Sequence, residues 1–175
     1  GDLALALTRK VLPDGAVVGI DSALETLALA KKRMKKRGLE HLSFIHADAL
    51  DTGLPSNYFD GAVMAYGLRN LSDYQQGLNE LHRVLKPGAR AGILDFNQHE
   101  DGSIGSRFQK FYLRKIVVRI AAKAGLREHY AYLEESLKKF PKGSIQEEMA
   151  IKAGFNSARH RLLALGQMGI LLLQT

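Results

Sequence analysis

The chain has 175 residues, of which 46% are hydrophobic and 25% are charged, as is typical of one globular domain. Its formal net charge of +7 fits an anionic partner or a solvated surface. No zinc finger, RNP-like segment or basic heptad region accompanies that charge, so we expect no nucleic-acid binding. Cysteine is absent, which excludes disulfides and thiolate chemistry, and we expect no metal site. No signal-peptide pattern is visible, and because residue 1 is not Met we expect the natural N-terminus to lie upstream.

Short apolar runs alternate with amphipathic stretches through the first half of the chain. The runs 16–20, 42–46, 61–66 and 91–96 predict buried strands, with a helix at 3–11 and further helices between the strands. Such continuous apolar strands between helices favour a mostly parallel sheet that is covered on both faces.

Three helix starts have the spacing of a capping box, in which two side chains satisfy free N–H groups of the first turn. The pairs are Ser22 with Glu25, Ser72 with Gln75, and Ser144 with Glu147. These pairs predict that the helices begin directly after Ser22, Ser72 and Ser144.

The pattern changes after Phe96. Residues 98–142 begin polar and turn-rich and then become aromatic, aliphatic and basic at helical spacing, so we expect an inserted helical cap. The runs 158–165 and 168–173, joined by Gly166-Gln167, predict an antiparallel hairpin. The prediction is therefore a single α/β domain over residues 1–175, mostly parallel, with an antiparallel end.

Acidic residues follow the first two predicted strands. Asp21 can accept hydrogen bonds from both hydroxyls of a ribose, and it can equally well cap the next helix. Asp48 can accept the exocyclic amine of adenine while Ala49 leaves room for the flat ring, although an ordinary turn explains the same pair. Neither signal is specific by itself.

Polar residues also follow the next two strands. Arg69 and Asn70 stand after the strand that ends at Tyr66, and they suit either a functional site or an ion pair with a helix cap. Asp95 ends the fourth strand, where it can orient an acceptor or pair with Arg69. Because the carboxyl ends of parallel strands share one edge, we expect Asp21, Asp48 and Arg69 to converge on a single cleft.

These residues form part of a wider set of motifs. The segments are Asp21, Asp48-Ala49, Phe59-Asp60, Tyr66-Gly67-Leu68-Arg69-Asn70, Arg83-Val84-Leu85-Lys86-Pro87-Gly88, 130–136 and Ala153-Gly154-Phe155. In combination they resemble the ubiquinone/menaquinone-biosynthesis C-methyltransferases, which are class I S-adenosylmethionine-dependent enzymes. The resemblance implies a Rossmann-like sheet and methyl transfer from S-adenosylmethionine to a ring carbon of a prenylated quinol. Leu94-Asp95-Phe96-Asn97 and Met168-Gly169 look most like the plastid and cyanobacterial branch, which makes phylloquinone or a related naphthoquinone.

The chain departs from the family pattern at three places. The first strand and its glycine-rich loop are absent, and Gly1-Asp2 match the last two residues of that loop. We therefore expect a sheet that lacks its first strand and has two unpaired edges. Ala65 stands where some relatives carry Ser, and Asp95 replaces a more usual Glu.

The resemblance also implies roles for individual residues. The residues implied in cofactor binding are Gly1, Asp2, Asp21, Ser22, Asp48, Ala49 and Ala65. The residues implied in substrate binding are Tyr66, Asp95 and Tyr132. Arg69 and Asn70 take the catalytic positions: Arg69 stabilises a phenolate or positions a water that takes the proton, and Asn70 holds the hydroxyl.

The implied partner is a prenylated quinol, with the cap over its ring and the basic residues of the cap against an anionic membrane. The implied location is a chloroplast or a cyanobacterial-type cytoplasm, and a homodimer is compatible with the sequence. Two other readings stay open: an inactive or truncated scaffold subunit, and a nucleic-acid or small-molecule O-methyltransferase.

Overall fold

The structure is a computed structural model of the chain, and it describes residues 1–11, 13–98 and 135–175. Most of the expected cap over 98–142, including Tyr132, lies outside these ranges. Among the described residues, no helix has the length and apolar character needed to span a membrane.

Helices and strands alternate in chain order, as the sequence predicts. The elements are α1 (Asp2–Val11), β1 (Val17–Asp21), α2 (Leu24–Lys36), β2 (Leu42–His46), β3 (Phe59–Ala65), the 3-10 turn η1 (Leu68–Asn70), α3 (Tyr74–Val84), β4 (Leu85–Phe96), α7 (Gly143–Lys152), β5 (Ser157–Leu163), the 3-10 turn η3 (Ala164–Gly166) and β6 (Met168–Gln174). The main difference is β4, which already begins at Leu85, because Lys86-Pro87-Gly88 is part of the strand and does not only end the helix before it.

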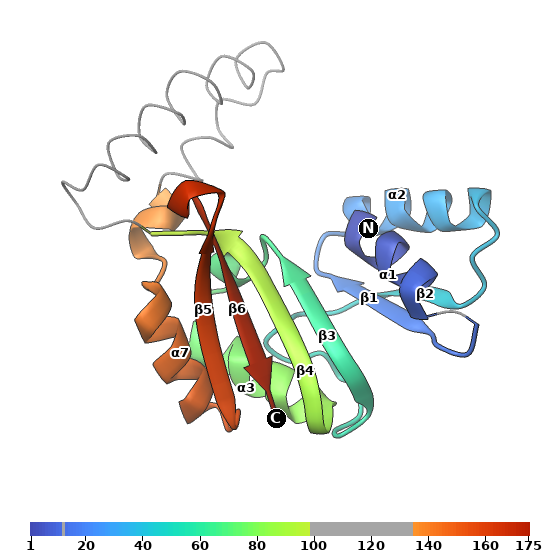
Figure 1. The fold of residues 1–175 in the computed structure, drawn as a ribbon. Coiled ribbons are helices and arrows are strands. Elements are labelled where there is room, and N and C mark those ends of the chain that lie inside the picture. The colour runs from blue at the N-terminus through green and yellow to red at the C-terminus, as the bar shows by residue number, and fades with distance from the viewer. Residues whose placement is uncertain (12, 99–134) are drawn as a thin grey trace, which may run out of the picture.

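The strands form two separate sheets (Figure 1). β1 pairs with β2, and the second sheet has the order β3-β4-β6-β5. Pairing is parallel between β1 and β2 and between β3 and β4, whereas β6 is antiparallel to both of its neighbours. Among the described strands, β1, β2, β3 and β5 each keep one unpaired edge. The unpaired edges of β1 and β3 agree with the expected gap in the sheet.

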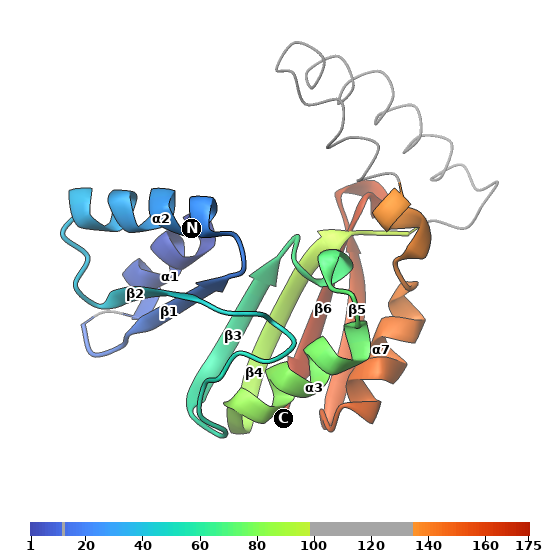
Figure 2. The same ribbon diagram turned by 180° about the vertical axis from the view of Figure 1, so that it is seen from behind.

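One face of the four-stranded sheet is covered by α3 and α7, as Figure 2 shows from behind. The core between them includes Leu78, Ile93, Phe140 and Leu171, each at most 2% exposed. The other face, toward the viewer in Figure 1, carries no described helix, so the prediction of helices on both faces is wrong for this part of the structure. The reason is that α1 and α2 pack on the β1–β2 pair instead, around a smaller core.

Two of the predicted capping boxes are wrong because a neighbouring carboxylate takes the place of the serine. The N-cap of α3 is Asp73, whose side chain accepts a hydrogen bond from the Gln76 N–H at 2.9 Å. Before α2, Asp21 accepts from the Ala23 N–H at 2.9 Å, and Ser22 makes no side-chain cap. A charged acceptor forms the stronger hydrogen bond with the partly positive N-terminal amides of a helix.

The third box, Ser144 with Glu147, is also wrong. α7 begins at Gly143, one residue before Ser144, and its N-cap Lys142 makes no side-chain cap. The Glu147 carboxylate instead accepts a hydrogen bond from the backbone N–H of His160 on β5 at 2.5 Å. Glu147 therefore contacts the edge strand β5 and does not cap the start of α7. The local sequence gives no sign of this contact.

Two charged residues of α3 anchor the segment that connects the two sheets. Glu80, 5% exposed, accepts hydrogen bonds from the backbone N–H and the hydroxyl of Thr52 at 2.8 and 2.5 Å. Arg83 donates to the Leu54 carbonyl at 2.7 Å and to the Ser56 hydroxyl at 2.8 Å, and it forms an ion pair with Glu80 at 2.7 Å. Together these hydrogen bonds lower the pKa of Glu80 to about 2. They fix where the chain enters β3.

Candidate functional site

The chain makes a strained turn at the carboxyl end of β3. Tyr66 has a φ of 57°, in the left-handed region that a bulky residue seldom adopts. Its N–H donates to the Leu94 carbonyl at 2.8 Å, and its carbonyl accepts from the Asn70 side-chain amide at 2.9 Å. Non-glycine residues in this region cluster at binding and catalytic sites. Asn70 thus braces the turn that presents Tyr66 and Arg69.

Arg69 is held on three sides at this strand end. Its Nη1 donates to the Asn70 Oδ1 at 2.8 Å and to the Ser136 hydroxyl at 3.1 Å. Its Nε lies 3.1 Å from the Asp95 Oδ1 in an ion pair, but the angle does not make a hydrogen bond. The Nε–H is therefore buried against the Asp95 carboxylate, which balances the guanidinium charge without forming a well-aligned hydrogen bond.

Asp95 supports Arg69 from within the sheet. It is 3% exposed and accepts hydrogen bonds from the backbone N–H groups of Arg69 and Phe96 at 3.2 and 2.8 Å. Burial raises the pKa of Asp95 above its ordinary value, and these two N–H groups and the Arg69 charge oppose that rise. The predicted pairing of Asp95 with Arg69 is confirmed as an ion pair.

An aromatic wall stands beside Arg69. The rings of Tyr66 and Phe96 lie 5.4 Å apart at 44°, and the Arg69 Cζ lies 5.7 Å from the centre of the Phe96 ring. The Tyr66 hydroxyl is 3.9 Å from the sulfur of Met168, the first residue of β6. Tyr66 is 42% exposed, so the wall is open to a ligand. Flat apolar surface next to a cation suits an aromatic ring that carries an oxygen.

A separate polar group lies at the carboxyl ends of β1 and β2. Asp21 and His46 are register partners, and the His46 Nε2 lies 3.0 Å from the Ser22 carbonyl oxygen, which ties the two strand ends together. The Asp48 Oδ1 accepts from the Leu50 N–H at 2.9 Å, just as the Asp21 Oδ1 accepts from Ala23. In the described hydrogen bonds each carboxylate uses only Oδ1, so the second oxygen of each can accept from a hydroxyl or an amine.

The remaining predicted cofactor residues are spread over this part of the chain. Gly1 lies at the start of α1, where its carbonyl accepts from the Leu5 N–H at 3.0 Å, and a Cβ at Gly1 would lie 2.7 Å from that of Ala30. Asp2 forms an exposed ion pair with Arg33 at 2.9 Å. Ala49 is half-buried beside Asp48, and Ala65 is the exposed last residue of β3.

The structure thus brings the predicted residues into two groups. Asp21, Ser22, Asp48 and Ala49 belong to the two-stranded sheet, and Ala65, Tyr66, Arg69, Asn70 and Asp95 to the four-stranded one. No hydrogen bond or ion pair in the described ranges joins the groups, so convergence on one cleft stays a prediction. An open depression of about 520 Å³ lies elsewhere, against α7 and Ala158, and it contains none of these residues.

Three contributors to the site were missed by the sequence reading. Phe96 and Met168 are register partners at the ends of β4 and β6, and Ser136 reaches Arg69 across a large gap in the sequence. Phe96 and Met168 could have been found from the sequence, because each is the terminal residue of a predicted strand next to the expected site. Ser136 ends the motif segment 130–136, but only the tertiary fold brings it to Arg69.

The family model described as the ubiE/COQ5 methyltransferase family matches residues 1–172. The chain belongs to this family. As a member of the ubiE/COQ5 methyltransferase family it is an enzyme that transfers a methyl group, and some of the segments that carried the resemblance form the two polar groups.

Curated members of the ubiE/COQ5 family are similar over almost the whole chain. A 2-phytyl-1,4-naphtoquinone methyltransferase from a Nostoc species is 45% identical over 99% of this chain and 76% of its own length. A chloroplastic 2-phytyl-1,4-beta-naphthoquinone methyltransferase from Arabidopsis thaliana is 38% identical over 97% of this chain and 66% of its own. A demethylmenaquinone methyltransferase from Thermus thermophilus is also 38% identical, over 97% and 76%.

Solved structures agree with the fold of the family. A SAM-dependent methyltransferase from Aquifex aeolicus superimposes with a TM-score of 0.69 at 20% identity, over 97% of this chain and 74% of its own. A Haemonchus contortus N-methyltransferase in complex with S-adenosylhomocysteine gives a TM-score of 0.67 at 14% identity, over 99% and 52%. At these identities the likeness concerns the fold alone. It confirms the class I methyltransferase architecture that the resemblance implied.

Proposed function

We propose that this chain carries the methyl-transfer site of an enzyme that methylates a ring carbon of a prenylated naphthoquinol, with S-adenosylmethionine as the donor. The observation that carries the proposal is the Arg69 guanidinium, which buried Asp95 holds beside the wall of Tyr66 and Phe96. The names of the Nostoc, Arabidopsis and Thermus relatives support the substrate class.

The chemistry of the first polar group fits a nucleoside cofactor. Asp21 and Asp48 end two adjacent parallel strands, and each keeps an oxygen for a hydroxyl or an amine. The N-terminus of α1 supplies N–H groups for a carboxylate. When bound, S-adenosylmethionine supplies an electrophilic methyl group. Ala49 and Ala65 remain proposed neighbours of that cofactor, as do Gly1, Asp2 and Ser22.

The second polar group fits the quinol. Tyr66, Phe96 and Met168 form an apolar surface for the ring, and the Arg69 guanidinium donates to the ring oxygen next to the reacting carbon. A negative oxygen raises the nucleophilicity of that carbon, and the permanent charge of Arg69 stabilises it. Asp95 is a positioning residue, because its buried carboxylate holds the guanidinium in place. Asn70 Oδ1 accepts from Arg69 and has a second lone pair for a substrate hydroxyl. Tyr132 stays a proposed substrate contact from outside the described residues.

We further propose that the whole chain is one methyltransferase domain that lacks the first strand, with the cap inserted over about 98–142. A parallel strand placed between β1 and β3 would pair both free edges and bring the two polar groups to one sheet edge. The setting that accords with the relatives is a chloroplast or a cyanobacterial cytoplasm, with contact to the membrane that holds the substrate. A homodimer remains part of this proposal.

Two titrations with S-adenosylmethionine test the domain proposal. We expect no binding by the chain of 175 residues and clear binding by a version extended with the first strand and glycine-rich loop of the Nostoc relative. Tight binding by both versions would contradict the need for that strand. Binding by neither would favour the scaffold reading over an enzyme.

A methylation assay on the extended version tests the substrate. We expect methyl transfer to a demethylated naphthoquinone only after reduction, because only the quinol has a hydroxyl to deprotonate. Arg69→Lys is expected to lower kcat by roughly 100- to 1,000-fold, the usual loss for one anion-stabilising donor. Arg83→Lys is the matched control, since Arg83 also pairs with a carboxylate but lies outside the site. Methylation of the oxidised quinone, or of an unrelated phenol oxygen instead, would overturn the proposal.

A further inference from the structure

The turn between β5 and β6 exposes three leucines. Leu162 is 59% exposed, Leu163 is 42% exposed and Leu165, in η3, is 94% exposed. Leu165 has a φ of 55°, between Ala164 at 50° and Gly166 at 84°, so the backbone holds this side chain outward at the tip. Leu162 and Leu163 end β5 and point to opposite faces of the sheet, and Leu165 follows in η3, so the three leucines surround the end of the hairpin as an apolar tip.

This tip lies at the edge of the sheet that carries the candidate site. Leu163 and Phe96 both pair with Met168 in the register, so β5, β6 and β4 reach the edge together. Asn97, 6% exposed, donates its side-chain amide to the Gly166 carbonyl at 3.0 Å and its backbone N–H to the Gln167 carbonyl at 3.0 Å. The hairpin turn is thereby fastened to the end of β4, next to the aromatic wall. Figure 1 shows the turn at the top of the sheet, between the end of β5 and the start of β6.

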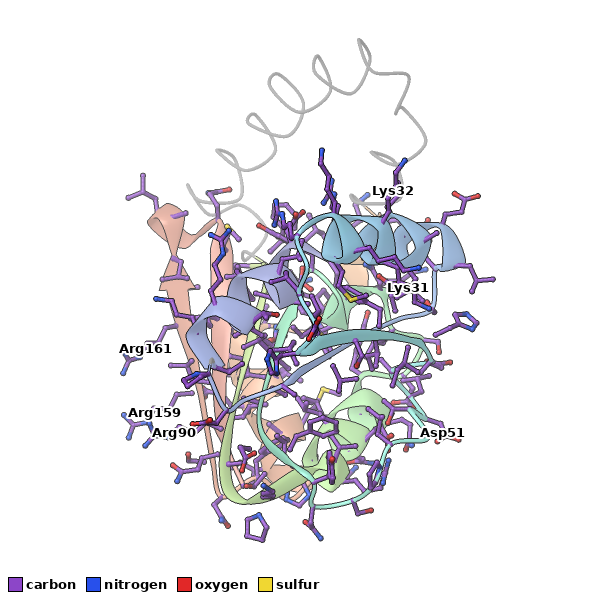
Figure 3. The ribbon with its side chains drawn as sticks, turned by 90° about the vertical axis from the view of Figure 1, so that its right-hand side faces the viewer. Lys31, Lys32, Asp51, Arg90, Arg159 and Arg161 are labelled. Atoms are coloured by element: carbon purple, nitrogen blue, oxygen red, sulfur yellow. The ribbon has the colours of Figure 1, made fainter. Side chains whose placement is uncertain are left out.

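Unpaired cations lie behind the tip on the bare face of the sheet. Arg159 and Arg161 on β5 are exposed and make no ion pair within the described ranges, and neither does Arg90 on β4. Figure 3 shows all three pointing away from the same side of the molecule, with Arg161 nearest the turn. In a bilayer, hydrocarbon lies beneath a layer of anionic headgroups. When the apolar tip enters the hydrocarbon, the arginines behind it lie at the level of the headgroups.

We propose that the β5–β6 turn is the membrane-docking element of this protein: Leu162, Leu163 and Leu165 insert into the interface of an anionic bilayer while Arg159 and Arg161 contact lipid phosphates. The link to catalysis rests on the proposed function, because an apolar quinol resides in the bilayer and the aromatic wall lies beside the inserted turn. The docking itself does not depend on which reaction follows. A second copy of the chain is a less suitable partner, because two such faces would bring like-charged arginines together.

Co-sedimentation with vesicles tests the docking surface. We expect the chain to bind vesicles of mixed phosphatidylcholine and phosphatidylglycerol, and Leu165→Glu to reduce the partition coefficient roughly tenfold or more, as expected when an inserted leucine becomes charged. Leu24→Glu on α2 is the matched control, since Leu24 is 65% exposed and the change in charge is the same. Equal binding by the original chain and Leu165→Glu overturns the proposal, as does an equal loss in Leu24→Glu.

The contribution of Arg159 and Arg161 to lipid binding is measured separately. Arg159→Gln with Arg161→Gln is expected to remove the preference for phosphatidylglycerol over pure phosphatidylcholine, while Leu165→Glu lowers binding to both. Sedimentation velocity of the same variants tests whether a second copy of the chain covers the apolar tip instead. An original chain that self-associates, a Leu165→Glu variant that does not, and unchanged vesicle binding would together assign the tip to a second copy and overturn the proposal.

Activity separates this inference from the proposed function. In the extended version, Leu165→Glu is expected to methylate a tail-less quinol in solution at the original rate but to lose turnover of a phytyl quinol embedded in vesicles. If the extended version methylates neither quinol, the proposed function fails and the vesicle-binding result still decides the docking surface. If Leu165→Glu turns over the embedded quinol at the original rate, docking through this turn is overturned.

Discussion

The two sheets of this protein differ in how much holds each one together. The four-stranded sheet has a central pair of strands with neighbours on both sides and a core of twelve buried apolar residues against α3 and α7. The β1–β2 pair has no central strand and a core of six buried apolar residues beneath α1 and α2. A two-stranded sheet is at best marginally stable. Of the two polar groups of the proposed site, one belongs to this small sheet and the other to the four-stranded sheet. The proposed substrate residues therefore belong to the larger unit, whereas the proposed cofactor residues belong to the smaller one.

Amide hydrogen exchange would show this difference most strongly. We expect the amides of β1 and β2 to exchange about 100-fold faster, or more, than those of β4 and β6, because the smaller unit opens without unfolding the larger one. Exchange followed by mass spectrometry on the chain of 175 residues measures it. Adding the strand that is proposed to lie between β1 and β3 should reduce the difference. Equal protection in the two sheets would mean that they unfold as one unit.

Core truncations sharpen the same comparison. Leu171→Ala in β6, where the side chain is 1% exposed, is expected to lower the free energy of unfolding of the larger unit by about 2–5 kcal/mol. Leu27→Ala in α2, where the side chain is 3% exposed, should leave that transition where it is and increase exchange in β1 and β2 only. Urea unfolding followed by near-UV signals of the tyrosines measures the first effect. A large shift of the main transition in Leu27→Ala would show that the cores are coupled.

The connection between the two units is expected to weaken in acid. The pKa of Glu80 is about 2 in the folded chain and 4.5 as its ordinary value, so the unfolded state binds the proton more readily. The stability that Glu80 contributes is therefore complete above pH 4.5 and is lost as the pH falls toward 2. Glu80→Gln is expected to cost about 1.5–3 kcal/mol at neutral pH, through the hydrogen bonds of the charged group.

The acid dependence of Glu80→Gln compared with the original chain is the measurement that matters. Thermal unfolding at several pH values should show a smaller loss between pH 4.5 and 2 in the variant. An identical loss in both would assign the acid sensitivity to other carboxylates. Asp95 is a useful contrast, because burial raises its pKa and its titration acts on stability in the opposite direction.

The smallest effect is expected at the free edge of β3. Asp60 pairs with Lys86 at 2.6 Å, but the Asp60 side chain is 87% exposed, so solvent screens the ion pair. Asp60→Asn should leave the unfolding midpoint of the larger unit unchanged within error in a thermal melt. A clear decrease would show that this edge contributes more to the sheet than its exposure indicates.

Much of the fold could be predicted from the sequence because its signals are local. The apolar run 42–46 became β2 without change, and Gly166-Gln167 marked the antiparallel end of the sheet to within a residue or two. The ion pair of Arg69 with Asp95 could also be predicted as one of two alternatives, because both residues stand at the carboxyl ends of predicted parallel strands. The capping boxes failed because Asp21, Asp73 and the contact of Glu147 with β5 compete for the same groups.

By itself the sequence determined the alternation of strands and helices, the family and the residues at the strand ends, since these depend on periodicity and on short motifs. Only the tertiary structure decided that the strands divide into two sheets, because pairing depends on which strand is available as a neighbour. It also decided that Ser136 and Phe96 contact Arg69 and that three leucines stand exposed at the β5–β6 turn. Such contacts join residues far apart in the chain, where spacing carries no information.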